Sequence, residues 1–99
     1  RVVAGEGGTG ELEGVVFEQA VSVAPTTLPS HSTILTGLYP QDHGVRYNIH
    51  YRLGAGAQTL AESLGQAGYA TAAFPATQIV GRHIGLDQGF DHWSEPPKP

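Results

Sequence analysis

Thr27 and Asn48 are the residues whose types and spacing most directly suggest chemistry. They lie 21 positions apart in the stretch from Ala24 to Asn48, APTTLPSHSTILTGLYPQDHGVRYN. A threonine hydroxyl becomes a nucleophile when a metal ion or a base activates it. A carboxamide supplies N–H donors to an oxygen that gains negative charge in a transition state.

A helix is predicted directly after Thr27. Ser30–Thr36 carries its apolar residues on one side, Pro29 suits the first turn, and Gly37 stands where helices often end. Thr27 and Leu28 would then form the corner between a strand and this helix. Free N–H groups and the helix dipole make such a corner favourable for an anion.

The elements around this corner predict an α/β fold with a mainly parallel sheet, rich in loops. Val15–Val23 is β-branched and apolar, predicts a strand buried on both faces, and is ended by Pro25. Thr59–Glu62 has the pattern of a capping box, which starts a helix that Gly68 ends. Tyr69–Phe74 predicts the next strand. Such β/α alternation indicates crossover helices.

The remaining segments predict short or irregular structure. We expect a flexible segment over 1–10, the last turn of a helix over 11–13 with a stop at Gly14, and a turn over 39–44. We expect a strand fragment or extended loop over 45–53, a flexible connection over 54–57, a short helix over 77–82 and a polyproline-like or disordered end over 96–99. These segments divide the chain into an N-terminal remnant (1–14), a partial catalytic domain (15–93) and a Pro-rich tail (94–99).

The ordered motifs of this stretch resemble the nucleophile region of the alkaline phosphatase superfamily, in its sulfatase and nucleotide pyrophosphatase/phosphodiesterase branches. They are TLPSH at 27–31, LTGLYP at 35–40, HGV at 43–45, and Asn48. The resemblance extends over about Leu12 to Trp93. In the sulfatase branch the motif reads Cys or Ser, any residue, Pro, Ser, Arg, and its first residue is oxidised to formylglycine. The chain departs at Thr27 and His31, and threonine is not a substrate for that oxidation.

In the phosphodiesterase branch the nucleophile is a threonine bound to one of two zinc ions, and a later asparagine holds a non-bridging oxygen. The resemblance therefore implies Thr27 as nucleophile and metal ligand, Asn48 as oxyanion and substrate ligand, and His31 close to the substrate. It implies a small-molecule sulfate or phosphate ester as substrate and divalent metal ions, two zinc ions in the complete domain, as cofactors. The family's other metal ligands belong to regions outside these residues, so we expect an excerpt that is inactive without the remainder of its catalytic domain and that need not bind metal alone.

Simpler interpretations accompany each of these residues. Thr27 could cap a helix, Thr26 could replace it as nucleophile, and Asn48 could be a turn residue. Asp87, Asp91 and His92 could be metal ligands, but we expect them to stabilise the loop that contains them. The histidines do not form the i, i+4 pairs typical of zinc sites on helices; they are His31, His43, His50, His83 and His92. Of these, His43 is expected to support the turn that contains it.

Two other hypotheses remain for the whole chain. One is a degenerate, non-catalytic paralogue that serves as a binding or structural module. The other is an ordinary small α/β domain in which the motif is a coincidence.

Composition limits the partners. The 99 residues carry a net charge of −4, and no Lys/Arg cluster is present to bind a nucleic-acid backbone. Charged residues make up only 14% and glycine 14 of 99, a loop-rich balance that suits an excerpt from a large α/β enzyme. The absence of cysteine excludes disulfides and thiolate metal sites but leaves the compartment open. No signal peptide or membrane-spanning run is visible in the sequence, so the localisation stays unknown.

Overall fold

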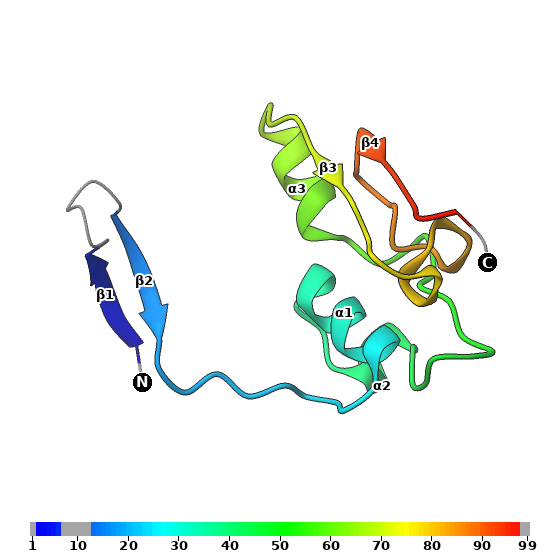
Figure 1. Cartoon of the computed structure of the whole chain (residues 1–99), viewed down its shortest axis with the longest axis horizontal. Helices are drawn as coiled ribbons and strands as arrows, with labels where there is room; N and C mark the ends of the chain where they lie inside the picture. The colour runs from blue at the N-terminus through cyan, green and yellow to red at the C-terminus, as the bar shows by residue number, and fades with distance from the viewer. Residues whose placement is uncertain (1, 7–12, 98–99) are drawn as a thin grey trace.

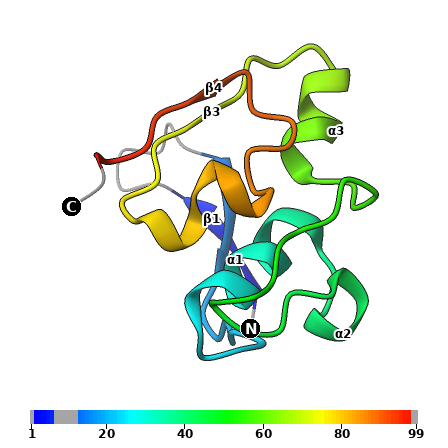
Figure 2. The same ribbon diagram turned by 90° about the vertical axis from the view of Figure 1, so that its right-hand side faces the viewer.

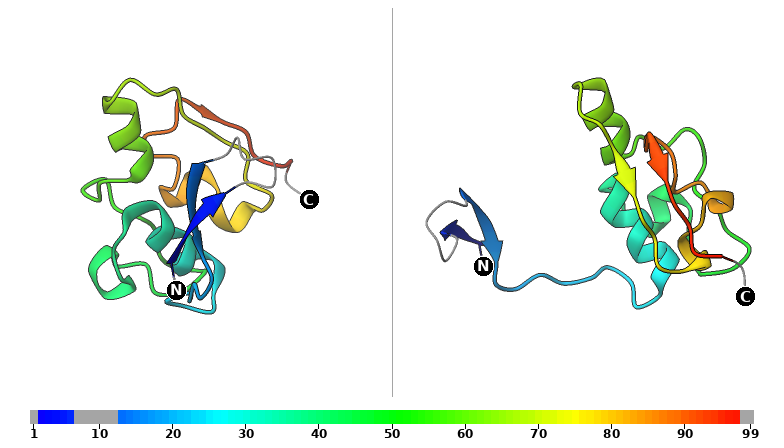
Figure 3. Two further views of the ribbon diagram at one scale, coloured as in Figure 1. Left: turned by 90° about the vertical axis from the view of Figure 1, so that its left-hand side faces the viewer. Right: turned by 45° about the horizontal axis from the view of Figure 1, so that its top comes forward.

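The computed structural model of the chain describes residues 2–6 and 13–97, which form two unequal parts (Figure 1). The smaller part is an antiparallel hairpin of β1 (Val2–Glu6) and β2 (Glu13–Phe17). The larger part contains the other elements: α1 (Thr27–Thr36), α2 (Pro40–His43), α3 (Leu60–Gln66), β3 (Ala72–Ala73), β4 (His92–Trp93) and the 3-10 turns η1 (Gln78–Val80) and η2 (Arg82–Ile84). Figures 1 and 3 show the hairpin standing apart, joined to the larger part by an extended segment.

The predicted α/β class is confirmed. In the larger part β3 pairs with β4 in parallel, with Ala72 opposite His92 and Ala73 opposite Trp93. The connection between these two strands passes through η1 and η2. Figure 2 shows the strand pair on one side of this part and α1 and α2 on the other. No helix in the described part of the chain has the length and apolar character needed to cross a membrane.

The core of the larger part is built mainly from loops and turns. Its buried apolar side chains are Leu28, Val45, Leu53, Val80, Ile84 and Leu86. A hydrogen bond of 2.8 Å from the Leu53 N–H to the Ile84 carbonyl joins two of the irregular segments that supply them. Burial of several aliphatic side chains, each worth about 1.5–3 kcal/mol, holds segments that have no regular structure of their own.

The capping box of α3 is confirmed. The Thr59 hydroxyl accepts a hydrogen bond from the Glu62 N–H at 3.1 Å, and Glu62 Oε1 accepts one from the Thr59 N–H at 3.1 Å. The Thr59 hydroxyl also donates to the Gln88 carbonyl at 2.8 Å. The helix is followed, as predicted, by Gly68 in the left-handed region, with φ 95°. One N-cap thus anchors both α3 and the loop before β4.

The prediction of a buried strand over Val15–Val23 is wrong in extent and in burial. The strand β2 is Glu13–Phe17, so Glu13 and Gly14 belong to a strand and not to the end of a helix. Val16 is 54% exposed and Val21 is 89% exposed. A two-stranded antiparallel pair has no layer to cover its faces, and within the described residues no further strand joins β2. β-propensity alone was therefore a poor guide to burial.

The remaining segments agree with prediction in part. Of the two alternatives for Val45–Leu53, a strand fragment or an extended loop, the structure has a loop without a strand, with Val45 and Leu53 buried at its ends. The strand predicted over Tyr69–Phe74 is confined to Ala72–Ala73, and the turn predicted over 39–44 contains the short helix α2. The short helix predicted over 77–82 is present as η1.

The two ends of the chain are described only in part. The segment predicted to be flexible contains β1, while residues 1 and 7–12 lie outside the described part, as do residues 98–99 of the tail. The tail is anchored at its start, because the Pro96 carbonyl accepts a hydrogen bond from Gln78 Nε2 at 2.6 Å.

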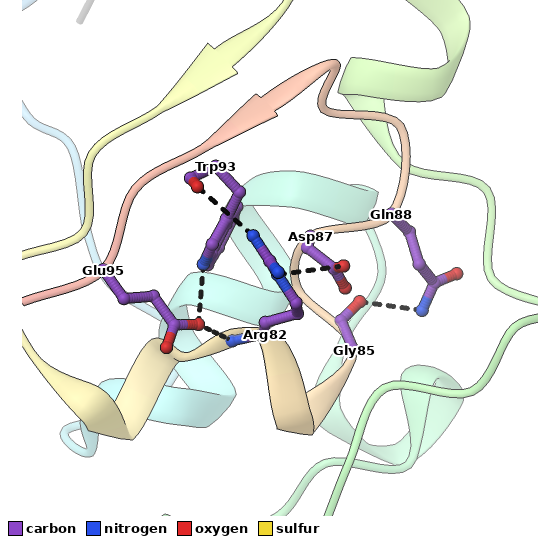
Figure 4. A network of polar contacts seen from close by, with 6 residues as sticks. All are labelled: Arg82, Gly85, Asp87, Gln88, Trp93 and Glu95. Atoms are coloured by element: carbon purple, nitrogen blue, oxygen red, sulfur yellow. Dashed lines mark hydrogen bonds and ion pairs between the residues drawn. The ribbon is translucent and has the colours of Figure 1, made fainter. Parts of the chain in front are cut away.

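A polar network fixes the segment after η2 (Figure 4). Arg82 donates from its guanidinium to the Trp93 carbonyl at 3.2 Å and lies 3.9 Å from Asp87. Glu95 accepts from the Trp93 indole N–H at 2.7 Å and from the Arg82 backbone N–H. Two hydrogen bonds lower the pKa of Glu95: the larger effect comes from the Arg82 backbone N–H and the next from the Trp93 indole N–H. As expected, Asp87 and Asp91 stabilise loops, Asp91 by accepting from the Thr71 N–H at 3.2 Å.

Candidate active site

The helix α1 begins one residue after Thr26. Thr26 is the N-cap, in extended conformation with φ −98° and ψ 152°, and its side chain makes no capping hydrogen bond. Thr27 is the first residue of the helix and half-buried. The interpretation of Thr27 as a helix cap is therefore wrong. Among the described residues, the Thr27 hydroxyl has no hydrogen-bond partner, so its oxygen is available to a ligand.

Asn48 lies against the first turn of α1. Its side-chain oxygen Oδ1 accepts a hydrogen bond of 2.8 Å from the Leu28 N–H. This bond replaces the missing cap from Thr26, because it satisfies one of the N–H groups that a helix leaves free at its start. It also fixes the orientation of the carboxamide: with Oδ1 on the helix, the Nδ2 amino group is the end left to donate elsewhere. The structure thus brings Asn48 to the residue next to Thr27.

Few backbone donors remain free at this helix end. The Leu28 N–H binds Asn48, Pro29 has no N–H, and the Ser30 N–H donates to the Thr26 carbonyl at 3.3 Å. Within the described part of the chain, the N–H left without a partner in this turn is that of Thr27. The Thr27 hydroxyl, the Thr27 N–H and the Asn48 amino group are therefore the polar groups available to an anion here.

His31 lies one turn along the helix from Thr27. Its Nδ1 is 2.7 Å from the Thr27 carbonyl oxygen, and the Ser30 hydroxyl donates to the same oxygen at 3.1 Å. Because the Thr27 carbonyl can only accept, His31 Nδ1 carries the proton in this bond. The ring is exposed on the surface of α1. His31 contacts the backbone of Thr27, and its Nε2 has no partner among the described residues.

His43 is buried at the end of α2. The Val45 N–H donates to its Nδ1 at 3.1 Å, and its Nε2 lies 3.0 Å from the Thr33 hydroxyl. Burial lowers the pKa of His43, an effect that the Pro29 carbonyl and Asp42 partly oppose. Both bonds suit the neutral ring with its proton on Nε2. The prediction that His43 supports its turn is confirmed.

The described residues do not by themselves provide a metal centre. No place in residues 2–6 and 13–97 brings together three or more His, Cys, Asp or Glu side chains that could hold a metal ion. His50 and His83, like the other histidines, belong to no such group within these ranges. Thr27 offers one neutral oxygen where divalent ions need several ligands, so this part of the chain could supply only part of a coordination sphere.

The loop that carries Asn48 is positively charged. Arg46 and Arg52 lie on either side of Asn48, both exposed, and neither makes an ion pair within the part of the chain that the structure describes. Val45 and Leu53 are fully buried at the two ends of this loop. The sequence reasoning missed this feature, although the spacing of the two arginines about a polar residue was visible.

Comparison with known proteins gives a single family. The family model of the sulfatases matches residues 9–96. The chain is 34% identical over 82 residues to an N-acetylglucosamine-6-O-sulfatase of Bacteroides thetaiotaomicron, a match that covers 83% of this chain and 14% of the relative. It is 34% identical over 87 residues to an ulvan-active sulfatase of Formosa agariphila, with 82% of this chain and 17% of the relative covered.

The chain therefore spans a small part of the length of the curated relatives that it matches. No solved structure is significantly similar to it. The sulfatase family generally uses divalent metal ions and acts on sulfate esters. The motifs around Thr27, the α/β fold and the match over nearly the whole chain agree with one another. The chain belongs to the sulfatase family.

Proposed function

We propose that this chain is the nucleophile-bearing segment of a metal-dependent hydrolase that acts on sulfate or phosphate esters. In this proposal the Thr27 hydroxyl loses its proton as its oxygen attacks sulfur or phosphorus, while the bond to the opposite alkoxide breaks and the alcohol leaves with a proton. Water then cleaves the new bond to the Thr27 oxygen, which releases the sulfate or phosphate and restores the hydroxyl. Asn48 donates from Nδ2 to a non-bridging oxygen, and the Thr27 N–H gives a second donor. The observation that carries the proposal is the hydrogen bond from the Leu28 N–H to Asn48 Oδ1, at 2.8 Å, which holds the carboxamide beside Thr27.

A negatively charged substrate suits the surroundings of Thr27. The start of a helix favours anions, and Arg46 and Arg52 add positive charge on the loop of Asn48. His31, with Nε2 exposed beside Thr27, is proposed to contact the substrate. The relatives' names give the first compounds to try: a 6-O-sulfated N-acetylglucosamine and ulvan.

We also propose that the remainder of a catalytic domain completes this site. A threonine hydroxyl is a weak nucleophile at neutral pH and needs activation, which a divalent ion would provide. Thr27 would be one ligand of that ion, and residues outside those described would supply the others. The exposed apolar residues of β2, among them Val16 and Phe17, are a natural surface for the rest of the domain to cover.

The test uses the complete product of the gene that encodes this chain. Hydrolysis of the 6-O-sulfated N-acetylglucosamine, of ulvan, of an aryl sulfate and of an aryl phosphodiester is measured with zinc and other divalent ions and after chelation. Thr27→Ala is expected to abolish the activity, while the matched variant Thr26→Ala retains it. Undiminished hydrolysis by Thr27→Ala would end the assignment.

A non-catalytic paralogue is the second candidate, favoured by the lack of a metal-ligand cluster in residues 2–6 and 13–97. Elemental analysis of the same complete product separates the two. Stoichiometric zinc supports the hydrolase, and its absence together with no hydrolysis supports the binding module.

A further inference from the structure

His43 links α1 to the loop that carries Asn48. The histidine is 8% exposed and is the last residue of α2, the short helix that follows α1 in the chain. Its Nε2 lies 3.0 Å from the Thr33 hydroxyl, in the middle of α1, and its Nδ1 accepts from the Val45 N–H at 3.1 Å. One buried ring thus ties the helix to the residue from which the loop departs.

The loop returns to the same helix three residues later. Val45 is fully buried, and Asn48 Oδ1 accepts from the Leu28 N–H at 2.8 Å. Hydrogen bonds therefore join this segment to α1 at both ends. One is between His43 and Thr33, and the other is between Asn48 and Leu28. Val45 and Asn48 are only three positions apart, so the backbone between them is short. A displacement of Val45 is therefore expected to move the Asn48 carboxamide.

We propose that His43 is a positioning residue for Asn48, which it holds at the start of α1 through the Val45 backbone. The role in catalysis rests on the proposed function of Thr27 and Asn48, whereas the positioning itself does not. Among the described residues, His43 makes no hydrogen bond to Thr27, and it is not one of the residues proposed to contact the substrate. It acts by fixing the start of a loop whose other side chains, such as Arg46 and Tyr47, face solvent.

The direct measurement is amide hydrogen exchange of the 99-residue chain by NMR, with the Leu28 N–H as reporter. The Glu62 N–H, which binds Thr59 in α3, is the internal reference because it lies in a different helix cap. Thr33→Val removes the hydroxyl partner with little change of shape. It is expected to speed exchange at Leu28 by about 3- to 10-fold, the effect of one hydrogen bond, with Glu62 unchanged.

Two substitutions of His43 separate its two bonds. His43→Asn places an oxygen where Nδ1 stood and keeps the Val45 bond, whereas His43→Gln places an amide where Nε2 stood and keeps the Thr33 bond. Both variants are expected to speed exchange of the Leu28 N–H relative to that of Glu62, because each loses one of the two hydrogen bonds by which His43 connects α1 to Val45. His50→Asn is the control: His50 is an exposed histidine two residues after Asn48, with φ 66°, a conformation that asparagine tolerates, and Leu28 exchange is expected to stay unchanged.

The outcomes distinguish this proposal from the proposed function. If Leu28 and Glu62 change by the same factor in Thr33→Val and the His43 variants, or if neither changes, His43 does not position Asn48. If Leu28 alone responds, positioning holds even where the complete gene product proves inactive. Where that product is active, Thr33→Val is expected to lower kcat about 3- to 10-fold with KM retained, because Asn48 is then misplaced more often.

Discussion

The β1–β2 hairpin and the larger part of the molecule differ in burial: β2 exposes its apolar side chains, whereas the larger part exposes some, such as Ile34 and Phe74, and buries others in a core. Val15, Val16 and Phe17 of β2 are all more than half exposed, whereas Leu28 and Leu53 are 0% exposed. The hairpin has a regular ladder and no cover, and the larger part has little regular structure and a closed core. In the hairpin, regular backbone hydrogen bonding is thus present without burial of the apolar side chains of β2.

The largest expected effect tests this difference in apolar packing. Leu28→Ala is expected to lower the free energy of unfolding by about 2–5 kcal/mol, because it leaves a cavity in the core beside Asn48. Val16→Ala, at a 54% exposed position, is expected to change it by less than about 0.5 kcal/mol. Urea unfolding followed by far-UV circular dichroism measures both. Equal losses in the two variants would show that β2 is buried in solution.

A glycine in each part gives the next comparison. A Cβ added at Gly89 would lie 2.3 Å from the Glu62 nitrogen, and the residue has φ +88°. Gly89→Ala is therefore expected to cost about 2–4 kcal/mol, from the strained backbone and the clash with the cap of α3. A Cβ added at Gly14 in β2 would have no atom within 4 Å. Gly14→Ala is therefore the matched control and is expected to be neutral or slightly stabilising. Thermal unfolding curves of the two variants would contradict this if their midpoints moved equally.

The two helix caps sharpen the comparison within the larger part. Thr59 caps α3 with its hydroxyl and also binds the Gln88 carbonyl, whereas Thr26 caps α1 without a side-chain bond. Thr59→Ala is expected to cost about 1–2 kcal/mol. Thr26→Ala is expected to cost less than about 0.5 kcal/mol, since Asn48 performs the capping there. Chemical denaturation midpoints measure the difference, and a larger loss for Thr26→Ala would deny Asn48 this role.

Sequence predicted the features that depend on a few neighbouring residues. The capping box of Thr59 and Glu62 and the left-handed Gly37 after α1 were found because both are set by local backbone chemistry. Strands were predicted less well, because Val15–Val23 has the composition of a buried strand but depends on partners distant in sequence. Ala72–Ala73 pairs with residues 20 positions away, a choice that no local pattern records.

In the candidate site, too, the sequence predicted candidate residues but not the contacts that depend on distant parts of the chain. The family motif singled out Thr27 and Asn48, and the structure places Asn48 against the residue after Thr27. Motif spacing could not give the orientation of the carboxamide, which depends on Thr26 leaving the Leu28 N–H free. The contacts of His43 with Thr33 also escaped prediction, since a buried histidine is recognised only when the packing around it is known.

The smallest expected effect is a pH dependence of the larger part that the hairpin does not share. Burial lowers the pKa of His43 from 6.5, so the folded chain binds a proton there less readily than the unfolded chain. Stability from this group is full above pH 6.5 and declines as the pH falls below it, by less than about 1.4 kcal/mol per pH unit. The lowered pKa of Glu95 acts only near and below its ordinary 4.5, so measurements between pH 5.5 and 7.5 isolate the histidine. The urea midpoint of the unmodified chain is expected to fall towards that of His43→Gln over this range, while amide exchange in β2, corrected for its intrinsic pH dependence, stays constant. If the difference between the two urea midpoints did not change with pH, the pKa of His43 would be the same in the folded and the unfolded chain.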